Sequence, residues 1–405
     1  MAREGIGLRV AQWRDIAGLT QQQLADAVGV SRPYITMLEN GRRSVDKRTL
    51  LDGLARALGV SITDLTGQPY PPVTRADLET YRVVPQVRAA LDEDDNGPVQ
   101  ARPLDQLEVA ADRAMAARMA CDMEALGRHL PALLAETRTL WFDNGDRTAG
   151  ALLVKAAVTG SLALKAAGWI DLGIRLSDLA DTVAAALGDP VCIAAAQFAV
   201  AQCALSTTAR KRSARLAKSG AEDLDRLTRT KLPPAMLNDV LAWMGVLHLH
   251  AALSDAALSG GDPDGHLAAA SAAARHVTGD PWRMEFSNAN VATWAVGIAL
   301  ENGQPERAPE LARLVDPNQL RTKQRRSRLY LDTGRALFVA GDSEAAVRAL
   351  LAADHAAPGD LRSRATAVEI VAQMVRDAPQ RGGSEQLRDL AVRVGVDPLA
   401  PGDAR

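Results

Sequence analysis

A helical repeat of apolar residues runs through most of the chain and limits what it can fold into. From about residue 104 onward, apolar side chains recur three and four positions apart, the spacing of one face of an α-helix. One example of this spacing comprises Leu152, Leu153, Ala156, Ala157, Gly160 and Leu164. Segments rich in Gly, Pro and Asp interrupt the pattern and enclose helices of roughly 15–20 residues. This rhythm predicts stacked helical hairpins in units of about 34–45 residues.

The composition favours a core made by helices. The chain has 405 residues, too many for one compact core, so we expect several units or a repeat array. Hydrophobic residues make up 47% but aromatic residues only 3%, which leaves Ala, Leu and Val to fill the interior. Such a core suits helix-on-helix packing and disfavours β-sandwiches, which use β-branched and aromatic side chains.

Cysteine usage and hydropathy predict a cytoplasmic protein. Three cysteines occur without a CxxC pair, which fits a reducing compartment and neither a disulfide framework nor a zinc site. We find no apolar run near the ~18 residues that a membrane span requires. The first charged residues are not followed by the long apolar stretch of a signal peptide. We therefore expect no membrane association.

The sequence carries no catalytic signature. It contains no GxSxG, no HExxH, no P-loop and no GxGxxG that follows a strand. His248 and His250 could suggest a metal pair, but residues two apart on a helix point to different faces. The sequence therefore predicts a protein that is not an enzyme, with no catalytic residue, no cofactor and no metal site.

Residues 19–41 read LTQQQLADAVGVSRPYITMLENG, a pattern with well-marked helix boundaries. Thr20 is a good N-cap, and Gln23 three residues later gives the spacing of a capping box. Gly29 can adopt the left-handed conformation that ends a helix, and Ser31 then caps a second helix. The pattern predicts two short helices joined by a tight turn.

The same spacing separates inward from outward side chains in these two helices. The residues expected in the core are Leu24, Ala27, Val28, Ile35 and Leu38. The residues left facing outward on the second helix are Arg32, Tyr34, Thr36 and Met37. The second helix therefore presents a mixed polar and apolar surface to a partner.

This segment resembles the helix-turn-helix (HTH) of the xenobiotic-response-element (XRE), or Cro/phage-repressor, family. The resemblance covers about residues 6–65 and rests on the specific pattern LTQxxLAxxxGVSxxxIxxxExG, with further helices at 8–17 and 47–58. It implies a five-helix domain that binds an operator in double-stranded DNA and regulates transcription. Arg14 and Glu39 match an ion pair that joins the first and third helices in this family.

The resemblance also implies roles for individual positions. The helix that begins at Arg32 would enter the major groove, where a guanidinium can bond O6 and N7 of guanine together. Pro33 would offer apolar contact, Tyr34 would touch sugar and phosphate, and Met37 is a second groove candidate. The full expected DNA-binding set is Gln21, Arg32, Pro33, Tyr34, Thr36, Met37, Asn40, Arg42, Arg43, Lys47 and Arg48.

The charge distribution allows this role, although the formal net charge of the chain is −2. The net value argues only against a broad surface that coats nucleic acid. Residues 32–48 carry five basic and two acidic side chains, a local charge of +3. This small charge predicts modest DNA affinity per head, strong dependence on dimerisation and a clear salt dependence.

One hairpin near the C-terminus resembles a tetratricopeptide (TPR) repeat. Tyr330 fills its large first position, and Gly334 and Ala346 are the small residues at which its two helices cross. Pro358 ends the second helix. The sequence departs from the repeat at Thr333, where Leu is usual.

Together these patterns predict an all-α protein: an N-terminal five-helix HTH domain joined to an α-solenoid of TPR-like hairpins. We expect residues 1–67 to form the DNA-binding domain and residues 68–103 a linker with a short helix. The linker contains the acidic segment DEDDNGP at 92–98, which is either a regulatory tail or a solvated connection. Residues 104–400 would form the solenoid for dimerisation and effector binding.

An XRE domain followed by TPR-like hairpins resembles two groups, the peptide-pheromone-sensing regulators and the actinobacterial XRE–TPR regulators. The resemblance implies a homodimer whose solenoid offers a concave groove for a peptide or small-molecule effector. The effector would shift the spacing of two DNA-binding heads. The alternative is a TPR interaction module that binds a partner protein, with DNA binding secondary.

Residues 284–294 are the best candidates for the effector groove. Phe286, Asn290 and Trp294 recur every four residues, so a helix would place them on one face. An Asn side chain there can bond a peptide backbone with both its donor and its acceptor. The alternative is that Phe286 and Trp294 belong to the core and Asn290 makes a structural hydrogen bond.

A second candidate for effector binding is the basic run RTKQRRSR at residues 321–328. Five of its eight residues are Arg or Lys. Such a run binds an anionic ligand, a partner or DNA phosphate, or it forms the solvated start of a helix.

Overall fold

The computed structural model describes residues 5–45, 47–72, 75–92, 99–256, 258, 260–378 and 384–397. These residues form α-helices, short 3-10 turns and connecting loops, and no β-strand lies among them. The expected all-α fold, an HTH head joined to a solenoid of helical hairpins, is confirmed. The acidic residues 93–98 and residues 398–400 of the expected solenoid lie outside the described residues.

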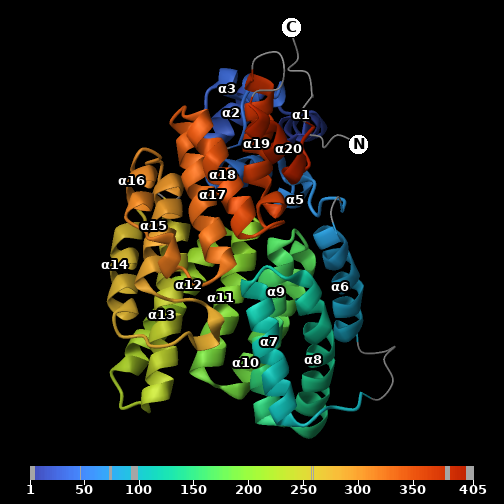
Figure 1. Cartoon of the computed structure of the whole chain (residues 1–405), viewed down its shortest axis with the longest axis vertical. Helices are drawn as coiled ribbons and strands as arrows, with labels where there is room; N and C mark the ends of the chain where they lie inside the picture. The colour runs from blue at the N-terminus through green and yellow to red at the C-terminus, as the bar shows by residue number, and fades with distance from the viewer. Residues whose placement is uncertain are drawn as a thin grey trace.

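The head (residues 6–66) consists of five short helices around one apolar core (Figure 1). They are α1 (Ile6–Ile16), α2 (Gln21–Val28), α3 (Arg32–Glu39), α4 (Arg48–Leu58) and α5 (Ile62–Thr66). The expected capping box starts α2, because the Thr20 side chain accepts from the Gln23 N–H and the Gln23 side chain accepts from the Thr20 N–H. Gly29 ends α2 at a φ of 71°, in the left-handed region.

The packing of α2 differs from the sequence expectation. Leu24 is fully buried as expected, and the small Ala25 is buried where a second helix packs, whereas Ala27 is exposed. Val28 lies half-buried at the edge of the core. Because α2 packs against both α3 and α4, the covered face is set by two neighbours and includes the small Ala25 instead of Ala27.

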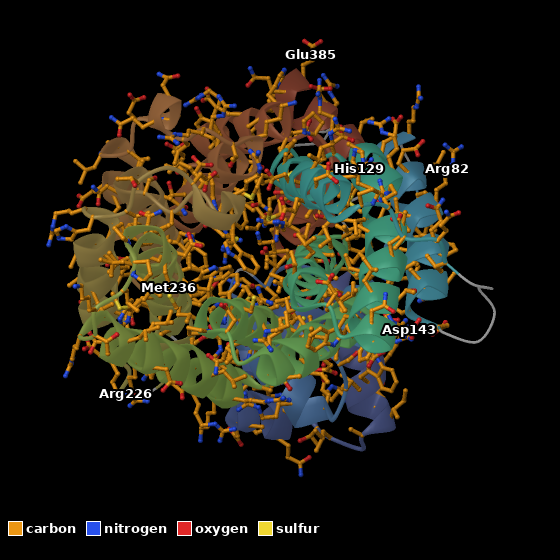
Figure 2. The ribbon with its side chains drawn as sticks, turned by 90° about the horizontal axis from the view of Figure 1, so that it is seen from below. Arg82, His129, Asp143, Arg226, Met236 and Glu385 are labelled. Atoms are coloured by element: carbon orange, nitrogen blue, oxygen red, sulfur yellow. The ribbon has the colours of Figure 1, made fainter. Side chains whose placement is uncertain are left out.

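The helices after the head wind into a superhelix. They are α6 (Arg75–Leu91), α7 (Leu104–Met119), α8 (Met123–Asn144), α9 (Arg147–Ala166), α10 (Ile170–Leu187), α11 (Pro190–Ser206), α12 (Arg210–Thr228), α13 (Pro234–Asp255), α14 (Pro263–Ala274), α15 (Asn288–Glu301), α16 (Arg307–Arg313), α17 (Lys323–Val339), α18 (Ser343–Ala356), α19 (Ala365–Asp377) and α20 (Glu385–Val394). The 3-10 turns among them are η1 (Pro281–Arg283), η2 (Pro317–Gln319) and η3 (Leu361–Ser363). Seen from below, the helices surround a central region filled by side chains (Figure 2).

Small residues lie where the helices of a hairpin cross closely. At Gly334 in α17, an added Cβ atom would lie 2.9 Å from the Leu350 side chain and 3.3 Å from the Ala346 carbonyl oxygen, both in α18. Ala346 is itself fully buried. The close approach that the sequence predicts between Gly334 and Ala346 is therefore confirmed.

Two helices correct the expectation that no stretch is long and apolar enough to span a membrane. By length and composition, α9 and α13 each contain a suitable 18-residue window, with mean hydropathies of 1.4 and 1.2. Of these windows, 72% and 61% are buried inside the protein. Burial of this extent is typical of core helices in a solenoid, which explains why both are so apolar.

The head docks on the solenoid through a buried ion pair. An Nη atom of Arg210, at the start of α12, lies 2.5 Å from an Oδ atom of Asp52 in α4. The two side chains are 4% and 2% exposed. Beside this pair, an Nη atom of Arg48 donates to the Ser206 hydroxyl at the end of α11 at 3.1 Å. We call this contact the α4–α12 seam.

A second seam joins the head to α19, near the C-terminal end of the solenoid (Figure 1). The backbone N–H of Ile6 donates to the Glu369 carboxylate at 2.9 Å. The Gln373 side-chain amide donates to the backbone carbonyl of Arg42 at 3.0 Å. The head therefore contacts both the middle and the end of the solenoid, and these contacts fix its orientation.

Replacing Gly334 with Ala tests the helix crossing. Because the new methyl would meet Leu350 at less than a normal contact distance, we expect the free energy of unfolding to fall by about 1–3 kcal/mol. Gly53→Ala in α4 is the matched control, because its new Cβ would lie 3.6 Å from the nearest atom of Val28. This control should keep the free energy of unfolding or raise it by up to about 1 kcal/mol. Urea denaturation followed by circular dichroism measures both, and equal effects would contradict the prediction.

Candidate nucleic-acid interface

Helix α3 has one buried face and one face turned to solvent. Ser31 caps the helix, and its hydroxyl accepts from the Tyr34 N–H at 3.4 Å. Ile35 and Leu38 are fully buried against the rest of the head, as the sequence predicts. Arg32 and Pro33 are exposed in the first turn, and Met37, one turn later, is 39% exposed.

A hydrogen-bonded network fixes α3 against α1 and α2. An Oε atom of Glu39 lies 2.6 Å from Nε of Arg14, so the expected ion pair is present. The Gln21 amide donates to the other Glu39 oxygen at 2.8 Å, and the Thr36 hydroxyl donates to the Gln21 carbonyl at 2.9 Å. Hydrogen bonding to Glu39 raises the pKa of Arg14, against the effect of burial. The network occupies the Gln21 side chain, so a contact of this residue with phosphate would use its backbone N–H in the first turn of α2.

Tyr34 and Thr36 are less outward than the sequence predicts, since both are half-buried. The Tyr34 hydroxyl donates to the Ser44 carbonyl at 3.3 Å, and the Arg43 guanidinium lies 5.6 Å from the Tyr34 ring centroid. These contacts tie the end of the loop back to α3. Asn40, Arg42 and Arg43 remain exposed in that loop, on the same head as Arg32.

The structure corrects two members of the expected DNA-binding set. The Arg48 guanidinium turns to Ser206 of the solenoid, and burial lowers its pKa. The Lys47 ammonium lies 3.7 Å from the place where a Cβ atom on Gly303 would stand. Because α4 begins at the seam with the solenoid, the Arg48 side chain turns toward α11 and the Lys47 side chain lies beside the loop after α15. We therefore leave Lys47 and Arg48 out of the candidate DNA-binding surface.

The expected effector face over residues 284–294 is also corrected. Helix α15 begins only at Asn288, with Ser287 as its N-cap, so Phe286 precedes the helix. Phe286 is 3% exposed and packs on Gly245, where an added Cβ would clash with its ring. Asn290 is 1% exposed, as expected of a core position. Of Phe286, Asn290 and Trp294, Trp294 alone lines the cavity described below, where its ring lies 5.8 Å from the Arg325 guanidinium.

The backbone before α15 explains why the helix starts late. Trp282, Arg283 and Glu285 all have φ near +50°, in the left-handed region that interrupts a helix. The Glu285 carboxylate accepts from the backbone N–H groups of Arg321 and Thr322, which holds this segment against the start of α17. The four-residue spacing of Phe286, Asn290 and Trp294 gave no sign that the helix begins only after Phe286.

The two histidines of α13 have different partners, as their spacing predicts. His248 lies 2.9 Å from His266, ring nitrogen to ring nitrogen, whereas His250 lies 2.8 Å from the Ser213 hydroxyl. Among the described residues, no group of three or more His, Cys, Asp or Glu side chains is arranged to hold a metal ion.

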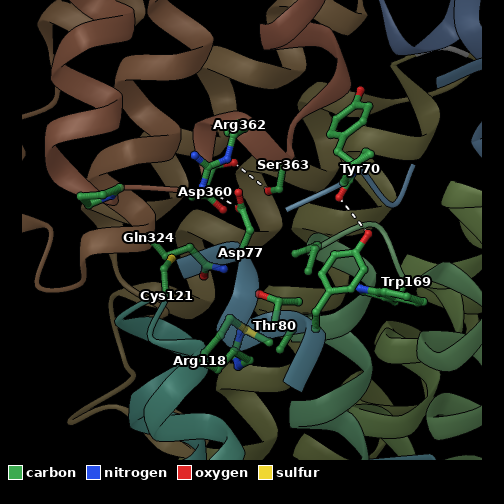
Figure 3. Close-up of a pocket in the computed structure, with 18 residues that line it drawn as sticks. Tyr70, Asp77, Thr80, Arg118, Cys121, Trp169, Gln324, Asp360, Arg362 and Ser363 are labelled. Atoms are coloured by element: carbon green, nitrogen blue, oxygen red, sulfur yellow. Dashed lines mark hydrogen bonds and ion pairs between the residues drawn. The ribbon is translucent and has the colours of Figure 1, made fainter. Parts of the chain in front are cut away.

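Sequence reasoning missed an interior set of cavities inside the superhelix. One of them lies between α6, the turn after α7, and η3, and its lining includes Tyr70, Arg118, Cys121 and Arg362 (Figure 3). There Arg362 pairs with Asp77 of α6 at 2.6 Å, so the last hairpins close against the helix that follows the head. The lining comes from distant parts of the chain; the only local signal was the basic run 321–328.

Comparison with known proteins finds similarity concentrated in the head. Residues 6–66 match the family described as Helix-turn-helix domain. An uncharacterized HTH-type transcriptional regulator, y4dJ of Sinorhizobium fredii, is 41% identical over 63 residues, which are 16% of this chain and 80% of that protein. A propionyl-CoA carboxylase regulator of Cereibacter sphaeroides is 33% identical over 132 residues. That match covers 32% of this chain, which spans only 25% of the length of the relative.

One solved structure aligns with most of the chain. It is Bacillus thuringiensis PlcR in complex with the peptide PapR7 and DNA, at 12% sequence identity. The alignment covers 87% of this chain and 95% of that chain, with a TM-score of 0.21.

Replacing Glu39 with Ala tests the network that orients α3. The change leaves the Arg14 cation without its carboxylate and the Gln21 amide without its acceptor, so we expect the free energy of unfolding to fall by about 1.5–3 kcal/mol. Glu39→Gln keeps an acceptor in place and should lose less. Thermal unfolding monitored by circular dichroism compares the three proteins. Wild-type stability in both variants would show that the network does not hold the head together.

Proposed function

The chain belongs to the helix-turn-helix transcriptional regulators, and we propose that it is a cytoplasmic homodimer of the XRE type that binds an operator in double-stranded DNA. The observation that carries this proposal is the outward face of α3, with Arg32 in its first turn and the Arg14–Glu39 pair behind it. A short helix held in this way can enter the major groove with its N-terminal residues toward the base edges.

The candidate DNA-binding surface comprises residues of α2, α3 and the following loop. Its members are Gln21, Arg32, Pro33, Tyr34, Thr36, Met37, Asn40, Arg42 and Arg43. Arg32 and Met37 read bases, whereas Gln21 and the loop contact phosphate. We assign residues 1–67 to DNA binding, 68–103 to a linker whose helix α6 packs on α8 of the superhelix, and 104–400 to a TPR-like solenoid.

Dimerisation follows from the small size of this surface. One eight-residue helix contacts a single half-site, and two half-sites one helical turn apart require two heads. The modest positive charge of each head strengthens this requirement, since the electrostatic part of DNA affinity grows with the number of phosphates neutralised. In this proposal the solenoid supplies the dimer contact and binds a peptide or small-molecule effector.

The two seams support control of the heads by the solenoid. The α4–α12 seam and the contact between Gln373 and the Arg42 carbonyl both join the head to helices of the solenoid. An effector that favours one arrangement of the solenoid would thereby shift the spacing of the two heads.

Replacing Arg32 with Ala tests the DNA-binding surface. We expect operator affinity to fall by about 1–3 kcal/mol and base preference to relax at one position, because the variant loses a bidentate contact to guanine. Arg56→Ala is the control in the same head, because this exposed arginine points toward the Thr208 carbonyl of the solenoid. Gel shifts with an operator selected from genomic fragments measure both. Unchanged affinity and selectivity in the Arg32 variant would refute its assigned role.

The alternative function is a protein-interaction module whose groove binds a partner, with DNA binding secondary. A genome-wide DNA-binding profile set beside mass spectrometry of a pull-down separates the two. Enriched promoter sites support the regulator, and their absence together with one dominant protein partner supports the alternative.

A further inference from the structure

A second interior cavity lies beneath the head, inside the superhelix, and we call it the cationic cavity. It is bounded by α4, α7, α9, α11, α13, α15 and α17 and by the start of α19, and the space not filled by protein atoms is about 910 Å³, open solvent included. Part of its wall is apolar, formed by Leu162, Phe198, Leu205, Leu253, Met284 and Trp294.

Six cationic side chains line this cavity, and they divide into two kinds. The first kind is neutralised by carboxylates. Arg328 lies 2.6 Å from Asp332, and Arg364 lies 2.8 Å from Asp360. The second kind has no carboxylate within ion-pair distance in the part of the chain that the structure describes. Its members are Arg48, Arg118, Lys165 and Arg325.

Arg118 is the most clearly unpartnered of the four. It is 7% exposed, and its guanidinium meets only the Arg283 carbonyl at 3.4 Å and the Met284 sulfur at 3.3 Å among the described residues. Its Nε atom has no hydrogen-bond partner there. Arg325 is similar, since its Nη2 atom reaches the Met284 carbonyl at 3.5 Å and its Nε atom is also unpartnered.

Lys165 is held in place by a chain of hydrogen bonds. Its ammonium donates to the Gln202 carbonyl at 2.7 Å, which leaves the Gln202 amide to donate to Nδ1 of His250 at 3.1 Å. Nε2 of His250 then bears the proton and donates to the Ser213 hydroxyl at 2.8 Å. Burial lowers the pKa of His250 to about 3, so the imidazole is neutral, and the chain of Gln202, His250 and Ser213 supplies no counter-charge. It orients Lys165 in the cavity wall without neutralising it.

Two of these cations, Lys165 and Arg118, are each disfavoured by another cation of the set. Burial, with repulsion from Arg48 next, lowers the pKa of Lys165 to about 7. Burial and repulsion from Arg325 lower the pKa of Arg118 to about 10. The charge of Asp52 favours the cation of Arg48, and that of Glu285 favours the cation of Arg325, so Arg118 and Lys165 are the two that most lack a counter-charge. A cation held away from water without a counter-charge costs stability, and an anion beside it would offset that cost.

We propose that the cationic cavity binds a small multiply charged anion that carries an apolar group. Arg118, Lys165 and Arg325 of the solenoid bind its phosphate or carboxylate groups, and the apolar group packs on the wall beside Trp294. The fourth cation, Arg48, comes from the first turn of α4 in the head. The anion therefore contacts head and solenoid together, and its role as the effector rests on the proposed function.

Calorimetric titration of the full chain without DNA tests the site. The probes are inorganic pyrophosphate and citrate, each compared with sodium chloride at the same ionic strength. We expect saturable binding of at least one probe, and the stronger one identifies phosphate or carboxylate as the preferred group. Failure of both probes to bind beyond the chloride control would overturn the proposal. Since no DNA is present, this result is independent of whether the heads bind an operator.

Two substitutions place the binding in the cavity. Arg118→Met and Lys165→Gln each remove one cation, and each should raise the Kd for the bound probe at least about tenfold. Arg128→Met removes an exposed cation on α8 and should leave the Kd within about twofold. Binding that is equally weakened by the Arg128 substitution, or unchanged by the other two, would overturn the assignment.

Stability without an anion distinguishes a ligand site from a structural role. If Lys165 lacks a counter-charge in the free protein, Lys165→Gln should keep or raise the Tm of that protein. The glutamine amide can donate to Gln202 in place of the ammonium, and the substitution removes a half-buried charge. It should also abolish most of the rise in Tm that the probe produces in the wild type. A lower Tm of the free variant with an unchanged response to the probe would indicate that Lys165 serves only the fold.

Discussion

The ion pair between Asp52 and Arg210 determines how the two parts of the protein meet. Both side chains are almost fully buried, so the loss of either partner would leave an uncompensated charge, at a cost of about 3–5 kcal/mol. Burial raises the pKa of Asp52, and the neighbouring charges of Arg48 and Arg210 oppose that rise. With α4 anchored there, its first turn carries Arg48 into the superhelix, and α3 is left with Arg32 on the outer side.

Some cations inside the superhelix are paired with carboxylates, and others are not. Arg335 lies between Glu301 and Asp332, and their opposite charges keep its pKa raised despite complete burial. Arg362 of η3 is likewise neutralised by Asp77 of α6, and this pair joins the last hairpins to the first helix after the head. Arg118 and Lys165 lack such partners, and their pKa values fall. The same fold thus contains arginines whose ion pairs join neighbouring helices, and cations that line the cationic cavity without a carboxylate partner.

Local signals predicted the head well because its helices begin and end within a few residues of their determinants. Thr20, Gln23 and Gly29 act through their own backbone neighbourhood, and the Arg14–Glu39 pair followed from a family pattern. Predictions failed where contacts with a distant or preceding segment determine where a side chain points or where a helix begins. Arg48 turns inward because Ser206 and Arg210 lie beside it, and Phe286 leaves the helix because left-handed residues precede it. The cationic cavity assembles residues from α4 to α19, so no local pattern marks it.

The second seam has a consequence for synthesis of the chain. The head is complete at residue 66, whereas α19, which supplies Glu369 and Gln373, begins at Ala365. About 300 residues separate them, which a ribosome adds in roughly 15–60 s at about 5–20 residues per second. During that interval the head has its own core but lacks its contact with α19. Until α11 and α12 have been made, it also lacks the α4–α12 seam. A nascent chain therefore displays a folded, unrestrained head before the solenoid that positions it exists.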